Sequence, residues 1–476
     1  MSHKPRIVKS PRIGLLEIKS KPYYIVASVE VGNTTTKCIL TATNMETGKT
    51  HIVTRCIRMT RDVRDPLPGE RVFGKTLTGV ELTRQSIAEL VRDTLLGAVN
   101  RANMDIKTDI HFVVRSTGVV AGFDLPEEVG EFIKALADGC LMAGIPPSRM
   151  TPAMSVNNLP TRFRKHSKME KVVFDGAVAS VIPPVGSTGV EIVANEMEGE
   201  LATAGIKEGA KWTDVDFRNP CISMDFGTTL DGRITNSDHP YAKTVGNYCG
   251  LAGAIPDALI KGTGLVDVYL GTVLDVFNGK TAGWLKTKLK KGTIKEYSAR
   301  VMEQISIEVV PESVNRYGSV PVNPAAAKEM GVVLIGCDVG ENGSGIDKVS
   351  EIGAEIYSNE SMEILFAVID DVMARIACKL VKVAMDNGLV PENISIGITG
   401  RAAITGNKPS IILRYLENLN IRSDIDQHVV FVDDGLARGA AVMARCMNSL
   451  GTPFNPLGGL SGGKCIMAER MKLQSH

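Results

Sequence analysis

The chain has 476 residues, which is too long for one ordinary hydrophobic core and predicts two or more domains. Hydrophobic residues make up 44% and charged residues 22%, so neither a disordered nor a fibrous protein is indicated. The 54 basic side chains nearly balance the 53 acidic ones, so the chain lacks a general positive field that would attract nucleic acid or an anionic membrane surface.

The N-terminal residues are basic and punctuated by proline, without the apolar segment of a secretory signal. Residues 1–22 are therefore predicted to form an arm ahead of the first domain. No uninterrupted apolar run of about 18 residues occurs, which argues against a membrane-spanning helix. We expect a cytoplasmic protein that binds neither membrane nor nucleic acid.

Nine cysteines are spread over the chain, with no Cys-x-x-Cys pair or other cluster spacing among them. Most of them stand in apolar runs, where reduced cysteine behaves as a small hydrophobic residue. The seven histidines are scattered as well. We expect no intrinsic iron–sulfur cluster and no histidine or cysteine metal site.

The first lobe is assigned to residues 23–146 and begins with an antiparallel meander, because three β-rich runs are joined by short turns. Apolar residues at helical spacing then predict two helices with a strand between them. The predicted strands lie at 23–31, 35–43, 51–58 and 110–115, and the predicted helices at 81–104 and 126–143.

Residues 147–219 are rich in proline, glycine and charge, and are predicted to be an insertion or linking segment with a strand at 189–194. The second lobe is assigned to residues 220–450, with an internal insertion at about 262–360, and residues 451–476 to a flexible C-terminal tail. The predicted strands of this lobe lie at 220–226, 231–236, 394–399 and 429–432, and its helices at 249–260, 361–387, 402–419 and 436–449.

Two of the predicted hairpins repeat one pattern, VEVGNTT at 29–35 and MDFGTTL at 224–230. In each, an apolar strand ends in an acid, one apolar residue, glycine and hydroxyl-bearing residues. A phosphate chain with its magnesium needs backbone N–H groups, hydroxyls, a glycine for close approach and carboxylates to hold metal-bound water. Glu30 and Asp225 are therefore expected to face each other across the phosphates. Taken singly, either hairpin is equally an ordinary turn whose glycine adopts a positive φ.

Two later segments favour a nucleotide site. The sequence IGITGRAA at 396–403 is predicted to run from a strand through Gly400 into a helix, so that its turn packs against adenosine. The sequence GLARGAAVMA at 435–444 predicts a helix of small residues, which lets two helices cross closely at a lobe junction. A tightly packed core helix is the alternative interpretation of this second segment.

These segments resemble the motifs of the superfamily of acetate and sugar kinases, heat-shock chaperones and actin. The resemblance covers most of the chain and implies an α/β fold of two duplicated ribonuclease-H-like lobes, the actin-like ATPase fold, with inserted subdomains and a nucleotide cleft between the lobes. In chain order, the matching motifs are a first phosphate motif at 30–37, a second phosphate motif at 225–231, a connecting helix at 250–259, an adenosine motif at 397–403 and a second connecting helix at 435–444.

Within that superfamily, DFGTTLDG at 225–232 and CGLAGAIP at 249–256 resemble the reductive activators of corrinoid proteins and hydantoinase-type relatives. The whole chain is similar to the methanogenesis marker 14 protein family of methanogenic archaea. This resemblance implies a role linked to methanogenesis and a protein partner, such as a redox or corrinoid enzyme complex. Corrinoid activators carry an iron–sulfur domain that this sequence lacks, so electrons for such a reaction would come from the partner.

The resemblance also implies a site for ATP or ADP with Mg2+. Asp225, Glu30 and Asp231 receive catalytic roles, and the first two are expected to hold Mg2+ through water. The superfamily usually carries Asp at the position of Glu30, and the longer side chain changes the reach of the carboxylate, which puts strong hydrolysis in question. The nucleotide-binding residues expected are Gly32, Asn33, Thr34, Thr35, Lys37, Gly227, Thr228, Thr229, Gly253, Gly400 and Arg401.

Three functions are compatible with these features. The first is an ATP-driven activase in which slow hydrolysis moves the lobes against a protein partner. The second is a nucleotide-responsive scaffold with little turnover. The third is a small-molecule kinase with Asp225 or Asp231 as general base, although the segment 147–219 shows no sugar-binding pattern.

Overall fold

The computed structural model describes residues 4–9, 11, 13–119, 123, 126–150, 153–155, 160–164, 171–173, 178–179, 196–236, 244–276, 291–329, 331–448 and 450. Two predicted features, the strand at 189–194 and the tail at 451–476, lie outside these residues. Within the described part of the chain, none of the helices combines the length and the apolar character that crossing a bilayer requires.

The first sheet has five strands in the order β10-β7-β2-β3-β4. Strands β2 (Tyr23–Val31), β3 (Thr35–Asn44) and β4 (Thr50–Met59) form an antiparallel meander, which confirms the three strands predicted there. Strand β7 (Phe112–Thr117) pairs with β2 in parallel, and β10 (Val178–Ala179) pairs with β7 in parallel. The sheet therefore has two antiparallel pairs followed by two parallel pairs.

Different helices cover the two faces of the first sheet. They are α2 (Arg84–Arg101), α3 (Pro126–Met142), α5 (Glu196–Ala210) and α14 (Gly435–Met447). Successive side chains of a strand point to opposite faces. From β2, Ile25 and Val29 enter a core with α2 and α3, whereas Tyr24 and Val26 enter a core with α5 and α14. By this alternation Glu30 stands on the face of α5 and α14.

The second sheet has eight strands in the order β1-β19-β18-β11-β12-β13-β17-β14. They are β1 (Arg6–Ile7), β11 (Cys221–Phe226), β12 (Leu230–Thr235), β13 (Thr244–Gly250), β14 (Ile305–Val309), β17 (Val333–Val339), β18 (Ser395–Thr399) and β19 (Val429–Val432). The run β13-β12-β11-β18-β19 has the order and the strand directions of β4-β3-β2-β7-β10. Asp225 is the next-to-last residue of β11, as Glu30 is of β2.

The second sheet also has two unlike faces. Ile222 and Met224 of β11 enter the largest core, which includes most of the long helix α11 (Met362–Asp386). On the other face, the hydroxyl of Ser223 forms a hydrogen bond with that of Thr203 in α5. Asp225 shares the face of Ser223, because the two residues are separated by one position in the strand. Glu30 and Asp225 thus both stand on the sides on which the two sheets meet.

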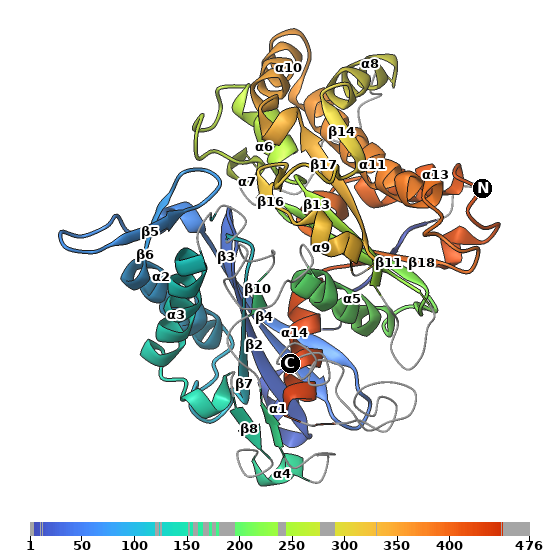
Figure 1. The fold of residues 1–476 in the computed structure, drawn as a ribbon. Helices are drawn as coiled ribbons and strands as arrows, with labels where there is room; N and C mark the ends of the chain where they lie inside the picture. Colours follow the sequence, from blue (N-terminus) through green and yellow to red (C-terminus); the bar gives the residue numbers. More distant parts are fainter. Residues whose placement is uncertain are drawn as a thin grey trace.

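The N-terminal end of the described chain lies on the second sheet, and its C-terminal helix lies on the first sheet. The N-terminal segment was predicted to be an arm, but its strand β1 pairs with β19 at the edge of the second sheet, and the N–H of Val8 donates to the carbonyl of Phe431. Conversely, α14 follows the last strand of the second sheet yet packs on β2, β3 and β7 of the first (Figure 1). The boundary predicted at residue 220 therefore does not separate two self-contained lobes.

Helix α5 crosses α14 at the junction of the two sheets, with the backbones in direct contact. A Cβ on Gly205 would lie 1.7 Å from the carbonyl oxygen of Gly435, and one on Gly439 would lie 2.0 Å from that of Leu201. This crossing confirms the close packing predicted for the small-residue helix at 435–444. Its partner corrects the interpretation of 147–219 as an insertion, because α5 lies in that segment and belongs to the core.

The crossing is reinforced by a buried ion pair. Glu208 of α5 accepts a hydrogen bond from Arg445 of α14 at 3.3 Å, and it also accepts from Lys211 and from the hydroxyl of Thr50 in β4. Burial alone would raise the pKa of Glu208, but Arg445 and Lys211 outweigh it and hold the pKa below its usual value. The junction is therefore tied by charge as well as by backbone packing.

Three further expectations about the second lobe need correction. The segment 249–260 begins as the end of β13 and becomes helical only in α6 (Ala254–Lys261), since Gly250 has a φ of +106° and touches the backbone of Cys337. The helix expected at 402–419 is divided into α12 (Arg401–Ile404) and α13 (Lys408–Glu417) by a turn at Gly406. The insertion expected at 262–360 supplies β14 and β17 to the main sheet.

The remaining elements lie outside the two main sheets. The helices are α1 (Leu15–Ser20), α4 (Thr161–Arg164), α7 (Val273–Val276), α8 (Lys291–Met302), α9 (Pro324–Glu329) and α10 (Ile346–Asn359). The small strands are β5 (Val72–Lys75), β6 (Glu81–Thr83), β8 (Ala153–Ser155), β9 (Lys171–Val173), β15 (Arg316–Tyr317) and β16 (Val320–Pro321). The helix predicted at 81–104 thus starts as β6, and Thr83 caps α2 by accepting from the N–H of Ser86.

Candidate functional site

The first hairpin turn, between β2 and β3, is held mainly by side chains. The N–H of Gly32 donates to the carbonyl of Thr35 at 3.0 Å, and the hydroxyl of Thr60 donates to the carbonyl of Gly32 at 2.7 Å. Asn33 was predicted to contact phosphate, but its buried side chain donates to Gly118 and accepts from the N–H of Leu77. Asn33 therefore fixes the turn to its neighbours.

The second hairpin turn, between β11 and β12, is held by backbone contacts with the start of α6. The N–H of Gly253 donates to the carbonyl of Gly227 at 2.8 Å, and the N–H groups of Ala252 and Ala254 donate to the carbonyl of Thr228. A Cβ on Gly253 would lie 2.6 Å from the oxygen of Gly227. Gly253 was predicted to contact the nucleotide, and the structure places it behind the turn as a support.

The two turns meet across the junction of the sheets. The hydroxyls of Thr34 and Thr228 are 2.8 Å apart, and Thr229, just after the second turn, is bridged to Leu251 near the start of α6. Arg401 donates to the hydroxyl of Thr35 at 3.1 Å, which brings the segment predicted to contact adenosine to the first hairpin. The structure thus gathers four segments that are far apart in the sequence.

Gly400 makes this arrangement possible. Its φ is +87°, a region that favours glycine, and a Cβ would lie 2.4 Å from backbone atoms of Phe226. The chain can therefore leave β18 and pass directly against the end of β11. The following helix α12 has only four residues, so the long helix with a free N-terminus that was expected here is not present in the described chain.

The centre of the site is a lysine surrounded by carboxylates. The ammonium of Lys37 forms an ion pair with Glu30 at 3.0 Å, and only 13% of the Glu30 side chain is exposed. Burial lowers the pKa of Lys37, but attraction to Glu30 and Asp225 outweighs burial and leaves that pKa above its usual value. Burial, opposed by Lys37 and assisted by Glu30, raises the pKa of Asp225 to about 7.

Asp231 stands opposite Asp225 in the β11–β12 ladder and was predicted to be catalytic. Its side chain is buried and hydrogen-bonded to Glu198, in the first turn of α5. Burial and then the charge of Glu198 raise the pKa of Asp231 well above its usual value. Because a neighbouring carboxyl group engages Asp231, the geometry favours a supporting role for Asp231 over that of a general base.

Two acidic residues of this site were not predicted. Glu198 was missed because its partner Asp231 is 33 positions away and its segment was interpreted as an insertion. Asp434 precedes α14 with a φ of +55°; burial and then Asp433 raise its pKa, and Lys37 is near enough to oppose that shift. The pair Asp433-Asp434 before a glycine-rich helix was a visible signal for an anionic helix start.

The parts of the molecule built on the first and second sheets are called the first and second lobes below. A second contact between them lies at the rim of the site. Arg61 follows β4 and forms a two-pronged ion pair with Asp275 of α7, at 2.7 and 2.5 Å, and donates to the carbonyl of Leu270. The neighbouring Thr60 binds the first hairpin turn, as described above. On the other side, Asp257 of α6 accepts from the N–H of Val273 at the start of α7. We call the Arg61–Asp275 pair the rim bridge.

The carboxylates of Glu30 and Asp225 are the described groups best placed for a magnesium ion. Within the described part of the chain, no cluster of three or more His, Cys, Asp or Glu side chains forms a ready cage for a metal. A magnesium ion held by two carboxylates keeps most of its water, so such a cage is not needed. The site fits an ion bound through water better than one bound by protein atoms alone.

These features define a mixed α/β protein with a buried acidic site where the turns of two sheets converge. The chain belongs to an archaeal family, because the model of the DUF2114 family, an uncharacterized protein conserved in archaea, matches residues 23–474. An uncharacterized protein of Methanocaldococcus jannaschii is 54% identical over 475 residues, 99% of this chain and 96% of its own. One from Methanothermobacter thermautotrophicus is 53% identical over 492 residues, 99% of this chain and 90% of its own.

Several solved structures are distantly similar. A reductive activator for corrinoid, iron–sulfur protein is 13% identical with a TM-score of 0.35, and the match covers 88% of this chain but only 60% of the activator. A putative N-acetylglucosamine kinase from Porphyromonas gingivalis is 10% identical with a TM-score of 0.35, over 88% of this chain and 98% of the kinase. A ROK hexokinase from Thermus thermophilus is 9% identical with a TM-score of 0.31, over 88% and 97%.

Proposed function

We propose that the protein binds ATP or ADP with Mg2+ between the two hairpin turns and works as an activase, using slow hydrolysis to move its lobes against a protein partner. The observation that carries the proposal is the convergence of both turns, with threonine hydroxyls 2.8 Å apart, beside Lys37 and the carboxylates of Glu30 and Asp225. Hydroxyls, glycine-containing turns, an ammonium group and two carboxylates are the groups that hold a metal-bound polyphosphate.

A nucleotide would rearrange three contacts of this site. Thr34 and Thr228 would exchange their mutual hydrogen bond for phosphate oxygens, and Lys37 would turn from Glu30 to a terminal phosphate. Arg401 and the Gly400 turn would lie against the nucleoside. Each exchange replaces a contact within the protein by one to the ligand, so binding would change how the two turns are held relative to one another.

Glu30 and Asp225 fit an ion held through water, because two largely buried carboxylates near one another repel, and this repulsion contributes to the raised pKa of Asp225. The magnesium ion would supply positive charge against the phosphates. Asp225 would then stay ionised and orient the attacking water. Asp231 and Glu198, which are hydrogen-bonded to each other, would position Asp225 from behind.

The lobe contacts offer a route from the nucleotide to a partner. The first turn is linked through Thr60 and Arg61 to α7, and α7 is linked through Asp257 to α6, which supports the second turn. A change in the separation of the turns would therefore act on the rim bridge, whereas the packed crossing of α5 and α14 would serve as the hinge.

The proposal also includes the type of fold, the location of the protein in the cell and the kind of partner. The shared order of five strands supports two duplicated ribonuclease-H-like lobes of the actin-like ATPase fold. The resemblance to the methanogenesis marker 14 family supports a cytoplasmic protein whose partner is a redox or corrinoid enzyme complex of methanogenesis. We propose no metal–sulfur centre of its own, so electrons for any such reaction would come from the partner.

A nucleotide-responsive scaffold with little turnover is the second candidate. It is favoured by the ion pair of Glu30 with Lys37, because a carboxylate engaged at 3.0 Å is less free to hold water on a metal. This candidate predicts tight nucleotide binding without partner-stimulated release of phosphate.

The test measures binding of a fluorescent ATP analogue with Mg2+ and release of phosphate, with and without redox complexes purified from a methanogen. We expect slow hydrolysis that at least one complex accelerates. Asp225→Asn should lower turnover by about 100-fold, the loss typical of removing an essential electrostatic group. Asp386→Asn, in an exposed ion pair with Lys382 at the end of α11, is the matched control and should behave as the unmodified protein.

The outcomes separate the candidates. Binding without turnover under all conditions would select the scaffold. Turnover that only a small metabolite accelerates would select a kinase. The absence of nucleotide binding would overturn the proposed function, and so would an equal loss of turnover in Asp225→Asn and Asp386→Asn.

A further inference from the structure

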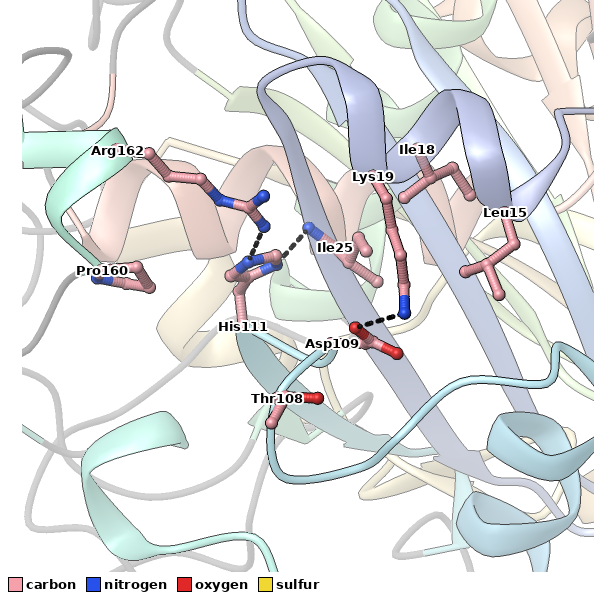
Figure 2. A pocket seen from close by; sticks show the side chains of 9 residues that line it. All are labelled: Leu15, Ile18, Lys19, Ile25, Thr108, Asp109, His111, Pro160 and Arg162. Atoms are coloured by element: carbon pink, nitrogen blue, oxygen red, sulfur yellow. Dashed lines mark hydrogen bonds and ion pairs between the residues drawn. The ribbon is translucent and has the colours of Figure 1, made fainter.

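A cavity of about 390 Å3 opens in the first lobe beside Leu15 and Ile18 of α1 (Figure 2). It reaches Ile25, which precedes Glu30 by five residues on β2, roughly 16 Å along an extended strand. Its apolar wall is formed by Leu15 and Ile18 of α1, by Ile25 and by Pro160. Cavities of this size bind small molecules, and the polar groups that converge on them set the specificity.

His111 is the most rigidly held polar group of the cavity. Its Nδ1 accepts a hydrogen bond from the backbone N–H of Ile25 at 2.9 Å. The ring stacks on Tyr24 and meets the edge of Phe163, with centroids 5.4 and 4.8 Å away. Burial, followed by the charges of Arg162 and Arg149, lowers the pKa of His111 to about 3, so the imidazole is neutral at physiological pH.

Arg162 and His111 present donors to each other. A neutral imidazole has one accepting nitrogen, and the fixed backbone N–H of Ile25 uses it, so Nε2 carries the proton. Nη2 of Arg162 lies 2.7 Å from this Nε2, and guanidinium groups cannot accept hydrogen bonds (Figure 2). When the guanidinium of Arg162 turns away from Nε2, an acceptor bound beside the two side chains would remove the conflict and receive a hydrogen bond from each.

The charges around the cavity limit that acceptor to a single negative charge. Lys19 lies 3.6 Å from Asp109, so one lining cation is already balanced by one lining carboxylate. Arg162 is then the cation in excess among the lining residues. A doubly charged phosphate would place its second charge in the field of Asp109, whereas a carboxylate would not.

We propose that this cavity is a binding site for a small aliphatic carboxylate. One carboxylate oxygen accepts from Nε2 of His111 and from the guanidinium of Arg162, and the aliphatic body lies on Leu15, Ile18, Ile25 and Pro160. The site is separate from the hairpin turns and does not depend on the proposed nucleotide function.

The test is calorimetric titration of the full chain with hexanoate and with hexanamide, which has the same body without the charge. We expect hexanoate to bind at least tenfold more tightly than hexanamide. Arg162→Gln should weaken hexanoate binding by about ten- to a hundredfold, the loss typical of one charged hydrogen bond, and leave hexanamide unchanged. Arg164→Gln is the matched control, because Arg164 is exposed on the same short helix and does not line the cavity.

Four results would overturn the proposal: no binding of hexanoate, equal binding of hexanoate and hexanamide, equal losses in Arg162→Gln and Arg164→Gln, or tighter binding of inorganic phosphate than of hexanoate. A second variant, Leu15→Ser, tests the apolar wall without touching the charges. It should weaken hexanoate several-fold and leave acetate unchanged. Circular dichroism of each variant would exclude loss of folding as the cause.

Discussion

The two lobes contact each other at a hinge and at a rim, and these contacts are built differently. At the hinge, α5 and α14 approach through glycines, so that backbone lies on backbone, and the Glu208–Arg445 ion pair beside the crossing is almost completely buried. At the rim, the lobes are joined by the charged side chains of Arg61 and Asp275, each about one quarter exposed. A partly exposed ion pair is weak and exchangeable, whereas packed backbone is not. If the lobes move as proposed, we therefore expect them to rotate about the hinge and to separate at the rim.

The largest expected effect comes from adding one methyl group at the hinge. In Gly205→Ala, the new Cβ would lie 1.7 Å from the oxygen of Gly435, so the helices must separate along the whole crossing. We expect a loss of about 3 kcal/mol or more in the free energy of unfolding, measured by urea denaturation. Gly130→Ala is the control, because Gly130 lies within α3 with open space around it, and it should gain roughly 0.5–1 kcal/mol. Equal effects would show that the crossing is not a fixed hinge.

A smaller effect is expected at the rim. Arg61→Ala removes the rim bridge and the hydrogen bond to Leu270, and we expect a loss of about 1–2 kcal/mol together with wider separation of the lobes. Distances between spin labels on α2 and α10 would report that separation.

The control for the rim is Arg300→Ala. Arg300 forms a similar two-pronged pair with Glu355, at 2.7 and 2.5 Å, but both residues belong to the second lobe. The Arg300→Ala variant should lose comparable stability without changing the distance between the spin labels on α2 and α10. If both variants widen the label distance equally, the rim bridge does not hold the lobes together.

The smallest expected effect concerns a proton beside the rim. Burial raises the pKa of Asp257 to about 7, so the folded protein keeps a proton that the unfolded chain has already released. The stability from this group is therefore complete below about pH 4 and is lost as the pH rises to 7. Asp257→Asn cannot ionise and still accepts from Val273, so urea denaturation should show a gain in stability at pH 8 and almost none at pH 4.

A residue with the opposite shift provides the control for this pH dependence. Backbone hydrogen bonds from Leu270 and Tyr269 lower the pKa of Asp267, so its contribution is present at neutral pH and lost in acid. Asp267→Asn should therefore reduce stability at pH 7, and this loss should shrink as the pH falls. Parallel pH profiles of the two variants would contradict the assigned burial of Asp257.

The features predictable from the sequence were those with local causes. The strands at 23–31, 35–43 and 51–58 follow from β-rich runs and short turns, and the two hairpins follow from their acid and glycine spacing. The contribution of the segment 262–360 to the sheet was not predictable in the same way, because the apolar run of β17 indicates a buried strand but not its pairing with β13.

The site shows the same limit. Its hairpin residues were predicted. The role of Glu198 became visible only when α5 was placed against β12. Asn33 and Gly253 were predicted to be ligands because the sequence does not show which backbone groups they support. Contacts between residues that are 33 or more positions apart are determined by tertiary packing. A single sequence has no local pattern that reveals such contacts.

The exchange of the chain ends has a consequence for synthesis. The first sheet leaves the ribosome early, but one of its faces stays uncovered until α14, which ends at Met447, has been made. At roughly 5–20 residues per second, the nearly 400 residues between β3 and α14 correspond to a delay of about 20–80 seconds. Throughout that interval Tyr24, Val26 and Phe112 lack the α14 side chains that cover them in the finished fold, so this apolar face is open to aggregation while the chain is being made.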